Sequence, residues 1–538
     1  MRAVLLAIVV TGCASSPGPV GELRFKNAAP VWSVDDQRPL KKAPDKRDYN
    51  RTLYHADGYA FRRVTRAMEL GTEVRAKDVN ALDEVPDSTW FENRIGVREY
   101  TIEELTRAAN VDDSPFDHRP WTLTGSKIGG MSVGFMFEDA KERKFLLKFD
   151  EARAPELETG AHAIVHRILW ACGYHVPQDF IGYIDPKDLV IGKKARAKGL
   201  DEAKLEAAMK LVFHDNGKIR VLASRFVSGK PIGPYAREGV RGDDPNDVIA
   251  HDQRRSLRGQ YPIFSWLNHT DLQEDNTIDS FDNGYVVHYL IDFGKALGVM
   301  GAVNKATYPG YQHRFDINAA VSNLFTFGLR KQPWDTLRQP KIRGIGLIDA
   351  EHYNPGTWKS SSMYYPLLSK DRHDAFWGAK IMMRFKPHEL AAIVKEAQFS
   401  DPRANAYMTE TLIKRQRATA RHWFDRVAPL DEFVVESRGQ VARMCFTDLM
   451  LSYKLRATPT AYAIDTFDHG GKATGHAQVL PATANGRACT DVPIVADNNG
   501  YTIVRLRVQR NKSEMPPVLV HLAQDASGAV RVIGLRRR

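Results

Sequence analysis

The sequence contains little cysteine, no long apolar stretch and few of the common catalytic motifs. Only four cysteines occur among 538 residues, and no two of them form a C-x-x-C pair. The H-E-x-x-H pattern of zinc proteases and the G-x4-G-K-[ST] phosphate loop are absent as well. No run beyond the first residues is long and apolar enough to cross a bilayer. With 43% hydrophobic residues, the chain is globular, and its chemistry must come from another arrangement.

Positive charge exceeds negative charge, but it is not concentrated. The net charge is +11, and the short basic clusters are Lys193–Lys198 and the tail Arg536–Arg538. A nucleic-acid-binding surface requires basic residues gathered on one face or stripe. We therefore expect a solvated basic surface and no nucleic-acid partner.

The first thirteen residues resemble a bacterial lipoprotein signal. Arg2 is followed by the apolar run Ala3–Val10 and then by V-T-G-C, which ends at Cys13. This run is too short for a transmembrane anchor. The resemblance implies cleavage before Cys13 and attachment of lipid to that residue. The expected location is the bacterial cell envelope, lipid-anchored at the outer membrane and outside the cytoplasm.

The stretch from His269 to Gly294 carries the most specific chemical pattern. It reads H-T-D-L-Q-E-D-N, followed by a hairpin-like segment and then by Y-L-I-D-F-G. Asp271 and Asn276 lie five positions apart, which lets one loop present a carboxylate and an amide oxygen. Two β-prone runs joined by Asp282-Asn283-Gly284 would fold Asp292 back beside them, because this turn has residues suited to positive φ.

A second candidate segment begins near Trp121 with T-L-T-G-S-K-I-G-G-M-S-V-G. Its glycines would let the backbone approach phosphate oxygens, although a tight hairpin without a ligand fits these residues nearly as well. The strand Lys144–Phe149 follows and carries Lys148 near its end. An amphipathic helix is expected at Glu156–Trp170. Glu158 in its first turn is the expected partner of Lys148, with Glu156 as the alternate.

Together these segments resemble the protein-kinase-like superfamily, and atypical bacterial members of the HipA or secreted type more than eukaryotic protein kinases. The resemblance covers residues 121 to 430 and implies an α+β, two-lobed fold that uses ATP with Mg²⁺ or Mn²⁺. It implies a nucleotide partner and an unknown protein or small-molecule acceptor. The catalytic residues that the resemblance implies are Asp271, His269, Lys148 and Glu158. The implied nucleotide-binding residues are Gly125, Ser126, Lys127, Gly129, Gly130, Ser132 and Lys148, and the implied metal ligands are Asn276 and Asp292.

Five segments follow from these patterns. They are the signal 1–13, a lead-in 14–120, a first lobe 121–230, a second lobe 231–430 and a C-terminal region 431–538. The last has short β-prone runs between turn residues, which predicts a small β-sandwich. Cys445 and Cys489 both lie in this region and are expected to form a disulfide outside the cytoplasm. Cys172 lies on an apolar helix face and is expected to be buried.

The loop His269–Asn276, called the central loop below, departs from the protein-kinase pattern in two ways. Gln273 stands where those kinases commonly carry a lysine, and Glu274 next to Asp275 makes the loop more acidic. The acidic pair indicates either strong metal binding or a non-protein acceptor. Two functional classes remain open: an active phosphotransferase or nucleotidyl transferase, and an inactive kinase-like lipoprotein that acts as a binding or structural module of the envelope.

We expect the mature chain to begin at Cys13. Mass spectrometry of the protein from a bacterial host should show residues 1–12 removed and the mass of attached acyl chains. Changing Cys13→Ser should abolish both. A mature protein that retains residues 1–12 contradicts the expectation.

Overall fold

The computed structural model describes residues 20, 24–68, 74–127, 133–327, 329, 331–475, 477–511 and 513–538. They form two compact units. The large unit comprises Val31–Asn80 and Glu84–Val427, and the β unit comprises the described residues up to Pro30, Ala81–Asp83 and Ala428–Arg538. The mixture of helices and sheets expected from the sequence is confirmed. Within the described part of the chain, no helix combines the length and apolarity needed to span a membrane.

Short helices lie in the N-terminal part of the large unit. They are α1 (Arg51–Ala56), the π-helix η1 (Asp57–Phe61), α2 (Arg62–Met68), α3 (Ile102–Arg107) and η2 (Pro115–Asp117). The side chain of Asn50 accepts a hydrogen bond from the backbone of Leu53 and so begins α1. Helix α3 begins with a capping box between Thr101 and Glu104, as the T-I-E-E sequence predicts.

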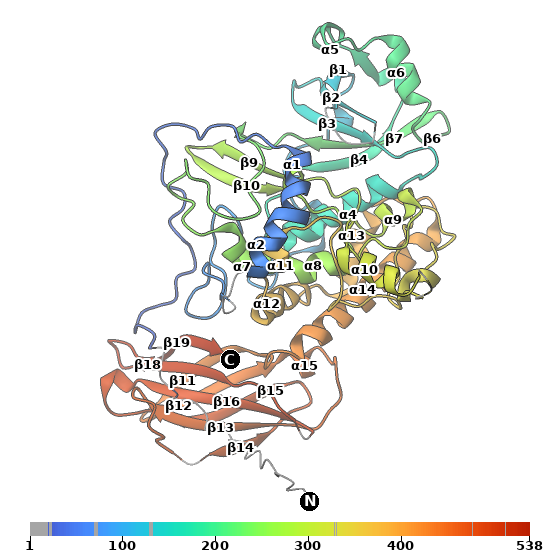
Figure 1. Cartoon of the computed structure of the whole chain (residues 1–538). Coiled ribbons are helices and arrows are strands. Elements are labelled where there is room, and N and C mark those ends of the chain that lie inside the picture. Colours follow the sequence, from blue (N-terminus) through green and yellow to red (C-terminus); the bar gives the residue numbers. More distant parts are fainter. Residues whose placement is uncertain are drawn as a thin grey trace, which may run out of the picture. The chain divides into compact units, whose positions relative to one another are not determined.

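A seven-stranded sheet forms the upper part of the large unit in Figure 1. Its order is β4-β7-β3-β2-β1-β5, and β6 pairs with β7. The strands are β1 (Trp121–Ser126), β2 (Gly134–Glu138), β3 (Lys144–Phe149), β4 (Asp179–Ile184), β5 (Leu189–Ile191), β6 (His214–Asp215) and β7 (Lys218–Arg225). Pairing is antiparallel except between β1 and β5. Trp121, Phe137 and Phe145 stack in its core.

Helix α4 (Leu157–Ala171) connects this sheet to the helices below it. It packs against β3, β4 and β7 and also against α13 (Pro387–Lys395). Nearly every residue of α4 is buried, so the helix is enclosed on all sides. Shorter helices follow β4 and β5: η3 (Pro186–Asp188), α5 (Lys193–Ala197) and α6 (Glu202–Met209).

A small sheet carries the central loop. It contains β8 (Lys230–Pro231), β9 (Thr277–Asp282) and β10 (Tyr285–Leu290), in the order β10-β9-β8. The turn of the β9–β10 hairpin has positive φ at Asn283 (50°) and Gly284 (90°), as its sequence predicts.

Residues 251–266 form three short helical pieces and not one continuous helix. They are η4 (His251–Gln253), α7 (Arg255–Arg258) and α8 (Gln260–Trp266). Arg254 is extended, and its guanidinium donates to Asp247 Oδ1 at 2.9 Å. The ion pair and the packing of this side chain over Trp90 outweigh helical continuity at that residue.

The remainder of the large unit is mainly helical. Its elements are η5 (Glu274–Asn276), α9 (Val299–Asn304), α10 (Ile317–Phe325), η6 (Pro333–Thr336), α11 (Tyr365–Leu368), α12 (Arg372–Met382), α13 and α14 (Pro402–Phe424). Buried Asp374 of α12 receives hydrogen bonds from Arg255 and Arg258 of α7, so the two helices are joined by a paired internal charge.

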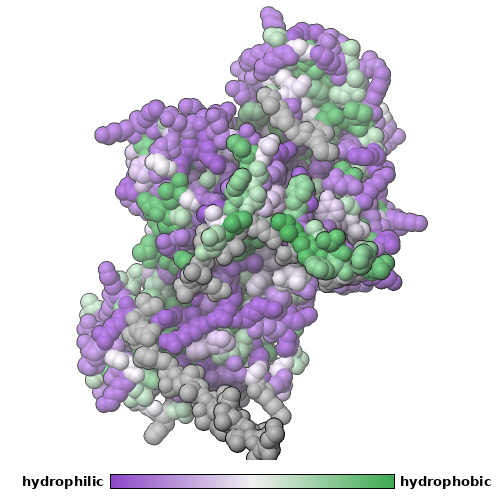
Figure 2. Space-filling view, viewed as in Figure 1, coloured by the Kyte–Doolittle hydropathy of each residue, from purple (hydrophilic) through white to green (hydrophobic). Residues whose placement is uncertain are grey.

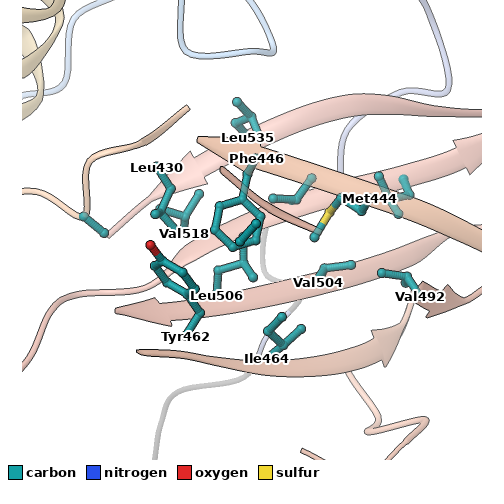
Figure 3. Close-up of a cluster of buried hydrophobic side chains, with 14 of the residues drawn as sticks. Leu430, Met444, Phe446, Tyr462, Ile464, Val492, Val504, Leu506, Val518 and Leu535 are labelled. Carbon is teal, nitrogen blue, oxygen red and sulfur yellow. The ribbon is translucent and has the colours of Figure 1, made fainter. Parts of the chain in front are cut away.

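The β unit contains two sheets whose inner side chains share one core. One sheet has the order β11-β12-β15, and the other has β14-β13-β16-β18-β19 with β17 paired to β16. The elements are β11 (Leu430–Arg438), β12 (Val441–Asp448), α15 (Leu449–Ser452), β13 (Thr460–Asp468), β14 (Gln478–Pro481), β15 (Arg487–Pro493), η7 (Asn498–Gly500), β16 (Thr502–Arg510), β17 (Ser513–Glu514), β18 (Val518–Gln524) and β19 (Val530–Arg537). Figure 3 shows Met444 and Phe446 of the first sheet facing Tyr462 and Leu506 of the second.

Residues from the start of the chain complete the β unit. Phe25 packs against His521 with ring centroids 4.8 Å apart, and its backbone N–H donates to Tyr501 Oη at 2.9 Å. A side chain at Gly534 would collide with the Phe25 ring, so a glycine is required there. Leu535 donates its backbone N–H to Ala81, which incorporates the short piece Ala81–Asp83 into the same unit.

The disulfide between Cys445 and Cys489 is present, as expected. The two residues lie directly opposite each other on β12 and β15, and the bond closes a separation of 44 residues. Cys172 is buried and reduced, and burial raises the pKa of its thiol above the usual value.

Replacing both Cys445 and Cys489 by alanine should destabilise the β unit by about 3 to 4 kcal/mol, because the open loop has more conformational freedom when unfolded. Thermal unfolding followed by circular dichroism measures the effect. A reducing agent should produce a similar loss in the wild type and in Cys172→Ala, and none in the double variant. An unchanged melting temperature in the double variant would contradict the stabilising role.

Candidate active site

The central loop between α8 and β9 presents two of the expected site residues. Asn276 is buried at the end of η5, and its Nδ2 donates to the backbone oxygen of Asp271 at 2.6 Å. This bond uses the amide nitrogen of Asn276. The amide oxygen Oδ1, on the other branch of the amide, is the atom that can act as an acceptor or metal ligand. The loop thus holds the Asp271 carboxylate and the Asn276 oxygen in a defined relation.

The β9–β10 hairpin brings Asp292 to the same place. Leu290 pairs with Thr277 at the open end of the hairpin, and the backbone N–H of Ile291 donates to Asn276 at 3.0 Å. Asp292 itself has φ of +62°, a left-handed conformation that costs free energy for a residue with a side chain. Such conformations persist where surrounding contacts enforce them, and they are concentrated at functional sites.

Lys148 supplies the principal counter-charge. It lies on β3 in the middle of the seven-stranded sheet, and its side chain is 6% exposed. Its Nζ lies 2.7 Å from Asp292 Oδ1, which joins the sheet to the turn after β10. The structure therefore brings Lys148, Asp271, Asn276 and Asp292 together from distant parts of the sequence.

His162 also contacts this ion pair, and the sequence analysis missed it. Its Nδ1 lies 2.9 Å from Asp179 Oδ2, and its Nε2 lies 3.3 Å from Lys148 Nζ. A carboxylate accepts, so Nδ1 carries the proton and Nε2 accepts from Lys148. The signal was available, because His162 follows Glu158 by four positions and therefore shares its face of α4.

Gly294 allows α4 to approach the site closely. A Cβ atom at this residue would lie 3.1 Å from the His162 ring and 3.4 Å from Glu158 Oε2. The distance to the ring is shorter than an ordinary van der Waals contact, and the distance to the carboxylate leaves no spare room. The glycine of the D-F-G sequence therefore serves helix packing here.

The two glutamates of α4 have different surroundings. Glu158 forms an ion pair with Lys295, the residue after Gly294. Glu156 is fully buried, accepts from the backbone and side chain of Ser400, and pairs with Arg343 at 3.0 Å. Glu156 therefore connects the start of α4 to the helical region. The ion pair that the structure gives Lys148 is with Asp292.

The glycine-rich segment is described only in part. Gly129, Gly130 and Ser132 lie outside the described residues. Gly125 is at a bulge near the end of β1, Ser126 follows it, and Lys127 donates its backbone N–H to Gly134 at 2.9 Å. Burial and nearby Lys148 lower the pKa of Lys127, whereas Asp292 and Glu158 raise it. The Lys127 ammonium is thus within electrostatic reach of the site.

His269 lies behind the loop, where it packs between aromatic rings. Its ring centroid is 5.2 Å from that of Phe264 and 6.0 Å from that of Phe293. Burial lowers the pKa of His269 to about 4, so the ring is neutral at pH 7. Its Nδ1 has no hydrogen-bond partner among the described residues. The His269 ring therefore supports the loop mainly by packing.

The excess acidity of the loop is neutralised from the N-terminal segment. Arg47 pairs with Glu274 at 2.7 Å, and Arg51 pairs with Asp275 at 2.8 Å. Glu274 also accepts the backbone N–H of Arg237 at 2.7 Å. These partners give the two acids a structural role, and neither the strong metal binding nor the acceptor preference suggested by the sequence is needed to explain them. Sequence spacing could not reveal pairs separated by more than 200 positions.

The two aspartates of the site have opposite pKa shifts. Burial, together with the nearby charge of Asp292, raises the pKa of Asp271 to about 6, and Arg314 acts in the opposite direction. Burial also acts to raise the pKa of Asp292, but the charge of Lys148 outweighs it and holds this pKa well below its usual value. Asp292 is therefore ionised at neutral pH, and Asp271 is suited to accept a proton.

The oxygen donors here fit a hard divalent cation. Mg²⁺ is commonly held by one or two protein oxygens, with phosphate and water completing its shell. Asp292 and Asn276 provide such donors. In the described part of the chain, no group of three or more His, Cys, Asp or Glu side chains forms a metal centre. Two protein oxygens would leave the other ligand positions of a cation to phosphate and water.

Comparisons with known proteins give only distant likenesses. No family model and no curated protein matches the sequence. A crystal structure of a Helicobacter pylori proinflammatory kinase, CtkA, is similar at 11% identity and a TM-score of 0.30, over 56% of this chain and 97% of that one. A crystal structure of the Golgi casein kinase with Mn/ADP bound is similar at 8% identity and a TM-score of 0.29, over 73% and 94%. Superpositions with scores this low carry no argument about activity.

Replacing Asp271 by asparagine should stabilise the metal-free protein at pH 7.5 by about 1 to 2 kcal/mol, allowing for partial exposure of the side chain. The folded-state pKa is raised, so the ionised carboxylate is destabilising above pH 6. The gain should shrink as the pH falls and should vanish below about pH 4, where the unfolded carboxyl is protonated too.

Thermal unfolding in EDTA across this pH range measures the effect. Asp275→Asn is the matched control, because it removes a charge paired with Arg51 and should give no gain. Asp271→Asn without stabilisation at pH 7.5 would contradict the raised pKa.

Proposed function

We propose that the chain is a kinase-like phosphotransferase that uses ATP with Mg²⁺ or Mn²⁺. The observation that carries the proposal is the convergence of Lys148 and Asp292, 2.7 Å apart, with Asp271 and Asn276 on the neighbouring loop. A structural ion pair alone does not require the adjacent Asp271, whose burial is unfavourable. A phosphotransfer site requires both kinds of carboxylate.

Each side chain has a role in this reaction. Lys148 and Lys127 would contact the nucleotide phosphates, and His162 would hold the Lys148 ammonium in position through its link to Asp179. Asn276 and Asp292 would hold the cation, which when bound neutralises phosphate charge. Asp271 would accept the proton of the attacking hydroxyl, a task for which a pKa of about 6 is suitable at neutral pH.

Two features of the proposal go beyond the site itself. The acceptor would be a hydroxyl on an unknown protein or small molecule, and transfer of a nucleotidyl group by the same residues is the alternative chemistry. The lipoprotein-like start supports a location in the bacterial cell envelope, lipid-anchored through Cys13. Because free ATP is scarce outside the cytoplasm, this location also favours the second candidate, an inactive kinase-like binding or structural module.

Three substitutions separate these candidates in calorimetric titrations of ATP with Mg²⁺. Asp292→Ala should abolish metal-dependent nucleotide binding, because the cation loses its carboxylate. Asp271→Ala should leave binding nearly intact and lower transfer by ~10²- to 10⁴-fold, the usual contribution of a general base. Lys148→Ala should weaken both.

Asp279→Ala is a control, because Asp279 is a buried acid of β9 that pairs with His288 and Arg241 away from these residues. If it folds, it should bind the nucleotide normally. A wild-type chain without nucleotide affinity in millimolar Mg²⁺ or Mn²⁺, indistinguishable from all three site variants, would reject the enzyme and leave the binding module.

A further inference from the structure

Hydrophobic side chains are exposed on one face of the large unit. We define the apolar face by Phe61 and Met68 of the N-terminal helices and by Leu324, Phe325, Phe327 and Leu329 in and after α10, which are between 71% and 90% exposed. Figure 2 shows hydrophobic side chains over these elements in a single view. Tyr59 and Phe315 link the two parts by an edge contact with centroids 5.3 Å apart.

The exposure follows from the way in which α10 is held. Asp316 caps the helix by accepting from the backbone of Ala319 at 3.2 Å, and it pairs with Lys359 at 2.5 Å. These bonds fix the polar start of the helix against the protein. Ile317, Val321 and Leu324 recur at helical spacing, and each is between 46% and 73% exposed. The apolar side of α10 is therefore directed outward.

The chain on both sides of this helix carries more positive than negative charge. Between positions 305 and 343 the sequence contains seven lysines and arginines and two acids. One of the seven, Arg343, pairs with Glu156. Both acids are engaged, Asp316 with Lys359 and Asp335 with the backbone of Gln332. Lys331 and Lys341 are exposed. Large aromatic and leucine side chains bordered by basic residues are typical of helices that lie in the interface of an anionic bilayer.

We propose that the apolar face binds the surface of an anionic lipid bilayer. Leu324, Phe325 and Phe327 would enter the region between headgroups and acyl chains, and the lysines would contact the headgroup phosphates. An ordinary protein partner has no requirement for a basic rim of this kind, and a second copy of this chain would bring two such rims together. This contact is separate from any lipid on Cys13 and does not depend on phosphotransfer.

Binding through this face would also orient the large unit on the bilayer. Phe315 follows Arg314, whose backbone N–H donates to Ser361 at 2.8 Å, and Ser361 donates to Thr270, the residue before Asp271, at 2.7 Å. Phe315 therefore lies two hydrogen bonds from the central loop, and docking would bring the Asp271 side of the site toward the lipid surface. A hydroxyl carried by a membrane component would be within reach more readily than one on a dissolved molecule.

Flotation with vesicles tests the proposal. The full chain carrying Cys13→Ser, which cannot be acylated, is mixed with vesicles of phosphatidylcholine alone or with 30% phosphatidylglycerol, about the level that gives a strongly negative surface. Binding to the anionic vesicles is expected to be at least about tenfold tighter and to weaken in high salt. Residues 1–12 are present in every protein compared, so a difference in vesicle binding between two proteins must come from the substituted residues.

Two pairs of variants assign the surface. Leu324→Asp with Phe325→Asp should lower anionic-vesicle binding by about tenfold or more, because charged side chains do not enter the bilayer. Val111→Asp with Leu211→Asp, which are 76% and 62% exposed elsewhere in the large unit, should leave it unchanged. Equal binding by both pairs would overturn the proposal.

Charge reversal provides an independent arm that leaves the apolar side chains intact. Lys331→Glu with Lys341→Glu should reduce binding to anionic vesicles and leave the weaker binding to neutral ones unchanged. Lys218→Glu with Lys230→Glu, also exposed, is the matched control. Sedimentation without vesicles tests the alternative, in which a second copy of this chain covers the apolar face. A wild-type dimer that Leu324→Asp converts to a monomer, with no change in vesicle binding, would assign the face to a second copy and reject the lipid surface.

Discussion

The ion pair between Lys148 and Asp292 is the interaction on which the candidate site depends. Asp292 is held in a left-handed conformation close to a second carboxylate, and partial burial disfavours its charge. Lys148 lies on a strand, and its ammonium is oriented from α4 by His162. The sheet, α4 and the β9–β10 hairpin must therefore be assembled before the two aspartates can have different pKa values. That difference is the chemical property that separates a metal ligand from a proton acceptor.

Local chemistry made part of this site predictable. The Asp282-Asn283-Gly284 turn has the residues that positive φ requires, so the sequence indicates a hairpin and places Asp292 beside Asn276. The strand around Lys148 also follows from its alternating pattern. In the same way, the T-I-E-E sequence predicts the start of α3, where both capping bonds are intrinsic to four consecutive residues.

Contacts between distant segments could not be predicted from local sequence patterns. The spacing of His162 to Glu158 places both on one face of α4, but the bonds of His162 to Asp179 and Lys148 join other strands and do not follow from that spacing. Arg47 and Arg51 lie in a polar lead-in, and only the folded chain brings them to Glu274 and Asp275. The break before α7 has a similar origin, because the charge of Arg254 is satisfied by tertiary partners.

The packing of Phe25 over Gly534 has a consequence for the time at which the β unit is completed. Phe25 enters this core from one part of the chain, and its partner Gly534 lies 509 positions later (534 − 25). At about 5 to 20 residues per second, the intervening chain takes roughly 25 to 100 seconds to emerge from a ribosome. During this interval Phe25 lacks its contacts with Tyr501, His521 and Gly534. Enzymes that act on the nascent chain would thus meet an open segment at Phe25, and the β unit would enclose it only after β19 has emerged.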